Sequence, residues 1–246
     1  MPKRAPKEAS SSSGSPLQGV LPLAGTPTCD SESPVVTPKR RKAIGKEAKP
    51  SPRCPLSHQR SVPPDASPNN RVLCVGWGPG ADEVPAGRPF VGKSGQLLRA
   101  MLREAGLLNM CGFANVCLYR PPPPRTKPTA AEIKGCLPVL LRTVGWVNPE
   151  VIICLGDVPG RVLGGFKGSV GSMVGKFRRR SDGILLVTTY HPAALLRARG
   201  TSTFGTYEHA TKEVFRQVAE RLAAGPGELM PQYDYLLMPV GGLTFE

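Results

Sequence analysis

The fold of this chain is constrained most by four short apolar segments that alternate with segments of helical periodicity. The apolar segments span residues 72–76, 113–118, 151–155 and 184–189. Apolar residues recur at helical spacing over residues 94–105, 129–144 and 207–222. Strands that alternate with helices form parallel βαβ units with helices on both faces of the sheet. We therefore expect an α/β fold, a three-layer sandwich with a central, mostly parallel four-stranded sheet.

Composition divides the chain into three parts. Residues 1–70 hold 13 of the 28 prolines, no aromatic residue, and 11 basic against 5 acidic residues. Such a segment buries too little apolar surface to offset its chain entropy. We predict a disordered, basic N-terminal region over residues 1–68, a folded domain over 69–222 and an irregular acidic tail over 223–246.

Charge and cysteine content narrow the class of protein. The net charge of +14 favours nucleic acid as a partner. No apolar run reaches the roughly 18 residues of a membrane span, so no membrane association is expected. Seven cysteines without an apolar secretory segment indicate a reducing compartment. The basic cluster at residues 38–42 predicts a nuclear import signal or a nucleic-acid-binding arm, and a mitochondrial presequence is the alternative.

Glycine, aromatic and polar residues follow the predicted strands, where α/β sheets collect their functional groups. The first strand leads into a glycine-rich loop and then a helix, but the spacing matches neither common phosphate-binding motif. The second strand leads to Asn115 and the stiff segment 120–122. The fourth leads to His191, with Pro192 at the first position of a helix.

Together these segments resemble the uracil-DNA glycosylase superfamily, most closely its family 4. The matching positions are Gly76, 78–80, 87–92, Gly95, 97–98, 115–116, 120–122, 155–156 and 190–197. The resemblance covers about residues 51–220. It implies a base pocket, because such an enzyme must flip its target base out of the DNA.

The resemblance also implies roles for individual residues. Phe90 would stack on the base, Asn115 would read its edge, and His191 would donate a hydrogen bond to uracil O2 as negative charge develops on the leaving base. The first loop would complete the base site with Gly76, Trp77, Gly78 and Pro79. DNA contacts would come from Arg88, Lys93, Ser94, Leu195, Leu196 and Arg197. One of the two leucines would fill the gap that the flipped base leaves in the DNA double helix. The plainer alternatives are a core aromatic for Phe90, a loop cap for Asn115 and core packing for the leucines.

The chain departs from the family at two places. The family has a glutamate directly after the first strand's glycine, where this chain has Trp77, and an indole has no basic site. Asp82 and Glu83 are the nearest replacement carboxylates for catalysis.

The second departure concerns the iron–sulfur cluster that family 4 members hold with four cysteines. Here Tyr119 takes one ligand position, Cys54 and Cys136 remain as remnants, and Cys117 is displaced by about 6–7 Å along an extended strand. We therefore expect the cluster to be lost, with no metal and no other cofactor.

Two functions remain open. The first is a monofunctional, monomeric uracil-DNA glycosylase of base excision repair, which hydrolyses the N-glycosidic bond of uracil in single- or double-stranded DNA and leaves an abasic site. The alternative is a catalytically degraded relative that binds nucleic acid or a protein partner. Phe90, Asn115 and His191 favour the enzyme, while Trp77 and the altered cysteines favour the alternative.

Overall fold

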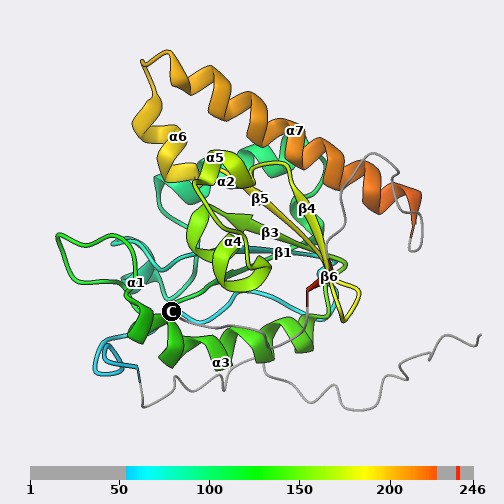
Figure 1. The fold of residues 1–246 in the computed structure, drawn as a ribbon. Coiled ribbons are helices and arrows are strands. Elements are labelled where there is room, and N and C mark those ends of the chain that lie inside the picture. Colours follow the sequence, from blue (N-terminus) through cyan, green and yellow to red (C-terminus); the bar gives the residue numbers. More distant parts are fainter. Residues whose placement is uncertain (1–53, 226–236, 239–246) are drawn as a thin grey trace, which may run out of the picture. The chain divides into compact units, whose positions relative to one another are not determined.

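The computed structural model describes residues 54–225 and 237–238, which form one mixed sheet covered by helices (Figure 1). The sheet has six strands in the order β2-β1-β3-β5-β4-β6. Their bounds are β1 Val72–Gly76, β2 Cys111–Asn115, β3 Val151–Leu155, β4 Phe177–Arg180, β5 Leu185–Thr189 and β6 Leu237–Met238. The predicted α/β class and mostly parallel sheet are confirmed, because β2, β1, β3 and β5 are mutually parallel.

The strand count differs from the prediction because of β4 and β6. β4 runs antiparallel to β5, and β6 pairs with β4. Three of the four residues of β4 are arginines, so this edge of the sheet has no apolar run that could have indicated a strand.

Helices cover both faces of the sheet. Their bounds are α1 Glu83–Ala86, α2 Lys93–Glu104, η1 Leu108–Met110, α3 Ala130–Val147, α4 Asp157–Gly164, α5 Val170–Met173, α6 Pro192–Ala198 and α7 Thr203–Ala224. The three predicted helices correspond to α2, α3 and α7, and α7 begins four residues before the predicted start.

Alternate residues of β1 enter two separate cores. Val72 and Cys74 pack with side chains of α2 and α7, whereas Leu73 and Val75 pack with side chains of α3 and α4. Figure 1 shows α2 and α7 on one side of the sheet and α3 on the other. This is the expected three-layer arrangement, in which successive side chains of a strand point to opposite faces.

Residues 54–68 lie before the predicted start of the folded domain, and they pack against it. Cys54, Leu56 and Val62 are buried. Asp65 exchanges two backbone hydrogen bonds of 2.8 Å with Phe113 of β2. β2 is an edge strand, so residues 54–68 satisfy backbone groups that would otherwise be unpaired.

Other predictions for the termini fall mainly outside the described residues. Residues 1–53, with the basic cluster at 38–42, are not described, and neither are 226–236 and 239–246. Within the predicted irregular tail, residues 223–224 belong to α7 and residues 237–238 form β6. Of the helices in the described part, none is long and apolar enough to cross a membrane.

Replacing Thr129 tests the start of α3. Its side chain accepts a 3.3 Å hydrogen bond from the Glu132 N–H, and Glu132 accepts one of 2.8 Å from the Thr129 N–H. Thr129→Ala removes half of this capping box and should lower the free energy of unfolding by about 1 kcal/mol. Urea denaturation measures this loss. Thr129→Ser keeps the acceptor and should behave as wild type, whereas equal losses in both variants would contradict the capping role.

Candidate active site

A cavity of about 200 Å³ opens beside the segments that follow β1 and β5. Because β1, β2 and β5 are parallel, their carboxyl ends lie at the same edge of the sheet. The predicted site residues that line the cavity are Trp77, Gly78, Pro79, Glu83, Phe90, Ser94, His191 and Arg197. The edge of the sheet therefore collects most of the side chains that the sequence singled out.

Phe90 is fixed by unusually close backbone packing. Its φ of 56° is left-handed, a strained conformation for a residue with a side chain. A Cβ on Gly95 would lie 2.1 Å from the Phe90 carbonyl, and the Arg99 Nε–H donates a 3.1 Å hydrogen bond to the same oxygen. The glycine in α2 thus lets the loop approach closely, and the buried ring is held at the cavity.

His191 presents a neutral imidazole to the cavity. It caps α6, and its Nδ1 accepts a 3.1 Å hydrogen bond from the Ala193 N–H. An acceptor at Nδ1 of a neutral ring places the hydrogen on Nε2. Burial, helped by the positive charge of Arg197, lowers the pKa of His191 to about 3. The ring is therefore an uncharged donor near neutral pH.

Trp77 lies flat against His191. The ring centroids are 4.2 Å apart with an interplanar angle of 9°. Lys127 places Nζ 5.4 Å from the Trp77 ring centroid and forms a 2.9 Å ion pair with Asp157. Trp77 thus excludes water from one face of the imidazole and helps to keep it neutral.

Asn115, the last residue of β2, has a buried amide with an unused donor. The residue is 4% exposed, and its Nδ2 has no hydrogen-bond partner within the described chain. A Cβ on Gly76 would lie 2.5 Å from Asn115 Oδ1 and 2.7 Å from the Phe90 ring. Gly76 therefore lets the amide and the aromatic ring approach each other, and a buried amide without a partner is suited to a polar ligand.

The two candidate carboxylates differ in their surroundings. Glu83 is 6% exposed, lines the cavity and accepts a 2.8 Å hydrogen bond from the Gly80 N–H. Burial raises its pKa, which the hydrogen bonds from Gly80, Phe90 and Val91 partly offset. Asp82 is exposed and does not line the cavity.

Only some of the residues predicted to contact DNA line the cavity. Ser94 and Arg197 line the cavity, whereas Lys93 is exposed and does not. Arg88 forms a 2.8 Å ion pair with Asp65, away from the cavity lining.

The two leucines of α6 also differ. Leu195 is 1% exposed and packs in the core, which agrees with the alternative of core packing rather than with a DNA wedge. Leu196 is half-buried. The helical turn explains the difference, because adjacent residues of a helix face different directions.

Two cationic residues of the cavity were not predicted as site residues. Arg120 and Arg125 follow β2 and line the cavity. Arg125 also pairs with the buried Glu132 at 2.8 Å. Arg120 lies in a matched segment, and its position after a strand is the signal that could have indicated it.

Three cysteines that the sequence placed apart come together. The Sγ atoms of Cys54, Cys117 and Cys136 all lie within 4.8 Å of one another, and all three residues are buried. The expected displacement of Cys117 is wrong, because β2 ends at Asn115 and residues 116–119 bend out of the strand. These thiols could hold a metal ion.

The fold and the cavity define an α/β protein with a cavity of about 200 Å³ at the carboxyl edge of its sheet. The family model described as Uracil DNA glycosylase superfamily matches residues 63–222. The chain is 40% identical over 155 residues to the Type-4 uracil-DNA glycosylase of Pyrobaculum aerophilum, which covers 59% of this chain and 79% of the relative. It is 37% identical over 150 residues to the Type-4 enzyme of Thermotoga maritima, which covers 59% and 78%. The Type-5 uracil-DNA glycosylase of Pyrobaculum aerophilum is 28% identical over 186 residues, which cover 68% and 77%.

The chain belongs to the uracil DNA glycosylase superfamily and is similar to its type-4 members, which confirms the resemblance drawn from the motifs. At the level of the family this is a DNA glycosylase, a hydrolase of DNA repair. The expected nuclear or mitochondrial location is contradicted, because these relatives come from archaea and bacteria, which have no nucleus.

The state of His191 can be measured directly. With a pKa of about 3 the folded imidazole should stay neutral from pH 8 to pH 5, protonated at Nε2. An unfolded histidine takes up a proton near pH 6.5, so this group contributes stability above that pH and the contribution falls as the pH drops from about 6.5 toward 3. Long-range ¹H–¹⁵N NMR spectra distinguish the two ring nitrogens. A His191 that titrates between pH 6 and 7, or that is protonated at Nδ1, would contradict this assignment.

Proposed function

We propose that this chain removes uracil from DNA by hydrolysing its N-glycosidic bond, which leaves an abasic site. The observation that carries the proposal is the neutral His191, whose Nδ1 is occupied by the Ala193 N–H and whose Nε2–H is left to donate within the cavity. A fixed donor of this kind stabilises an oxyanion, and the departing uracil carries negative charge on O2.

The base would enter the cavity after it has been flipped out of the DNA. The Phe90 ring offers a face for stacking, and its close packing against Gly76 and Gly95 fixes the position of that face. The unpaired Nδ2 of Asn115 can donate to uracil O4, while Oδ1 can accept from N3–H. A thymine has the same polar edge, so rejection of its methyl group would depend on the shape of the cavity.

Glycosidic bond cleavage also develops positive charge on the sugar, which a carboxylate stabilises. Trp77 cannot do this, because the indole carries only a donor. Glu83 is the carboxylate of the cavity lining, whereas Asp82 lies outside it. We assign the opposing charge to Glu83, which would also help to place the attacking water.

Cationic residues around the opening fit a DNA backbone. Arg120, Arg125 and Arg197 line the cavity and would contact phosphates, and Ser94 at the start of α2 would add a hydrogen bond. Leu196, which is half-buried, is the remaining candidate for the side chain that fills the gap left by the base. We expect the chain to act as a monomer.

We further propose that no four-iron cluster is held by this chain. Such clusters take four thiolates, and within the described residues the buried group offers three. The chemistry above uses no metal.

The second candidate function is nucleic-acid binding without cleavage. The stacking of Trp77 on His191 favours it, because the indole occupies the position after the first strand's glycine where the family has a glutamate. The two functions differ in whether His191 affects a reaction.

Replacing His191 separates these functions. An interaction made mainly in the transition state affects the chemical rate more than ground-state binding. His191→Ala should therefore lower the single-turnover rate on a uracil-containing single strand on the order of 100-fold. DNA affinity at fixed salt should barely change, since phosphate contacts supply most of it. Full activity in the variant would overturn the role of His191, and an inactive wild type would favour the binding function.

A second pair of variants tests which carboxylate acts. Glu83→Gln keeps a hydrogen-bond acceptor for the loop but removes the charge, so the single-turnover rate should fall on the order of 10-fold. Asp82→Asn is the matched control and should leave the rate unchanged. The opposite pattern, with Asp82→Asn slow and Glu83→Gln active, would move the charge-stabilising role to Asp82. Thermal unfolding of both variants shows whether the fold is retained.

A further inference from the structure

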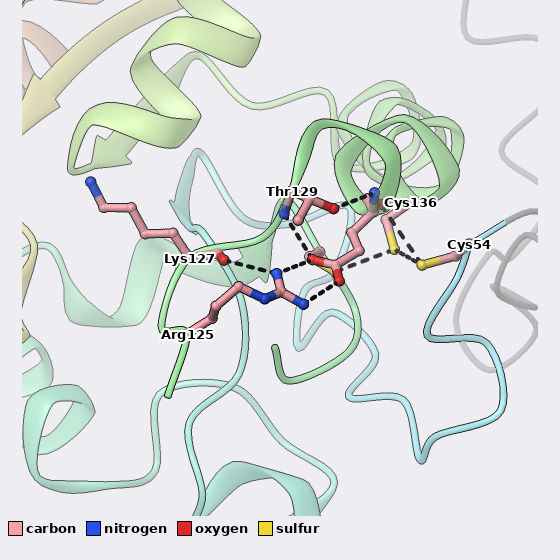
Figure 2. Close-up of polar contacts among 7 residues, drawn as sticks. Cys54, Arg125, Lys127, Thr129 and Cys136 are labelled. Atoms are coloured by element: carbon pink, nitrogen blue, oxygen red, sulfur yellow. Dashed lines mark hydrogen bonds and ion pairs between the residues drawn. The ribbon is translucent and has the colours of Figure 1, made fainter. Parts of the chain in front are cut away.

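A buried cluster of three cysteines lies behind the wall of the cavity. Cys136 Sγ is 3.5 Å from Cys54 Sγ and 3.6 Å from Cys117 Sγ. The residues come from the start of the described chain, the bend after β2, and α3. Figure 2 shows the sulfur atoms of Cys54 and Cys136 turned toward each other.

The spacing of the sulfur atoms suits a single ion better than a multi-iron cluster. Four thiolates around one tetrahedral zinc at about 2.3 Å lie about 3.8 Å apart. The contacts of 3.5 and 3.6 Å, and the limit of 4.8 Å for the whole group, agree with that edge length. In a four-iron cluster each thiolate binds a different iron, so the sulfur atoms surround a larger core.

The other cysteines of the described chain are not available to complete a cluster. Cys74 and Cys111 lie on the opposite side of the sheet, in the core beneath α2 and α7, and Cys154 lies in the core beneath α3 and α4. A four-thiolate cage is therefore not formed by the described residues. Cys29 lies outside them.

The backbone around the cluster is built for close approach. A Cβ on Gly135 would lie 2.5 Å from the Cys54 Cα, so only glycine lets this segment pack so closely against α3 beside Cys136. The Leu118 N–H lies 3.5 Å from Cys136 Sγ and points to it as a donor. Such a donor stabilises a ligating thiolate.

Tyr119 supplies an independent observation at the same place. Its side chain is fully buried in the cluster with the three cysteines, and its hydroxyl has no hydrogen-bond partner among the described residues. A buried hydroxyl without a partner requires an explanation, and a metal ligand position provides one.

We propose that Cys54, Cys117 and Cys136 bind one Zn²⁺ ion, with the Tyr119 hydroxyl at the fourth position. Thiolate ligands select soft or borderline ions, and zinc accepts tetrahedral sites rich in sulfur. Binding converts three thiols to thiolates and releases three protons, so the affinity rises with pH.

The ion would stabilise the wall of the cavity and take no part in the reaction. The Cys117 N–H donates a 3.0 Å hydrogen bond to the Trp77 carbonyl. A Cβ on Gly78 would lie 3.5 Å from the Tyr119 carbonyl. The bend that carries two of the ligands therefore packs directly against the loop that carries Trp77, and Arg120 follows it into the cavity lining.

Metal titration of the full chain tests the proposal. Protein purified under reducing conditions and stripped with a chelator is titrated with Co²⁺, and Zn²⁺ is then added. We expect the visible absorption of a tetrahedral cobalt thiolate site, its loss on addition of one equivalent of Zn²⁺, and a higher melting temperature with Zn²⁺ than without. If folded wild-type protein shows no cobalt thiolate absorption, the three thiols are core residues only and the proposal fails.

Single substitutions identify the ligands. Cys117→Ser and Cys136→Ser should weaken Zn²⁺ binding by about 100-fold or more, and Tyr119→Phe by about tenfold. Cys154→Ser, which changes a buried cysteine outside the cluster, is the matched control and should bind as wild type. Equal loss in the control would show that the assay reports disruption of the fold, and unchanged binding in Tyr119→Phe would exclude Tyr119 from the site.

Elemental analysis separates zinc from the other soft metals. Stoichiometric iron and acid-labile sulfide in anaerobically purified wild type would overturn the proposal in favour of a cluster, and copper(I) binding without zinc binding would overturn the choice of ion. Neither result would affect the proposed uracil excision, because the assays of His191 and Glu83 require no metal.

Discussion

Phe90 is packed between two glycines, and the cavity depends on that contact. Gly95 admits the Phe90 carbonyl at a position where a Cβ would lie 2.1 Å away, and Gly76 admits the ring where a Cβ would lie 2.7 Å away. Gly76 also leaves room for the Asn115 side chain. The left-handed φ of Phe90 is retained because these contacts over-determine its position. These contacts place the rigid Phe90 ring beside the Asn115 amide, whose Nδ2 has no partner among the described residues.

Burial of the imidazole determines the charge state of His191 at the cavity. Burial keeps His191 neutral, and the stacked Trp77 covers one face of its ring. A charged imidazole would bind any anion, whereas a neutral donor with a fixed tautomer interacts most strongly where charge develops during the reaction. Trp77 thus shields the imidazole beside it, but it does not supply the negative charge of the glutamate that family 4 members have at this position.

Much of the fold and of the candidate site could be predicted, because short apolar segments and glycines report on local structure. The three predicted helices and the four parallel strands are confirmed, and Phe90 and His191 lie at the cavity. Features set by tertiary packing could not be predicted. A strand that continued past Asn115 would place Cys117 away from the other two cysteines, but β2 ends at Asn115. The side of α6 that faces the core, which includes Leu195, is likewise set by tertiary packing. No local pattern indicates the stacking of Trp77 on His191.

The proposed hydrolysis of a glycosidic bond in this cavity proceeds without a carboxylate directly after the first strand's glycine, where this chain has Trp77. The most direct measurement mixes wild-type protein in excess with a single strand that holds one uracil, and analyses both products by mass spectrometry. We expect free uracil and a strand with an abasic site that alkali cleaves, while a matched thymine strand stays intact. DNA that is bound tightly but recovered with its uracil in place would show that the chain binds nucleic acid without hydrolysing the glycosidic bond.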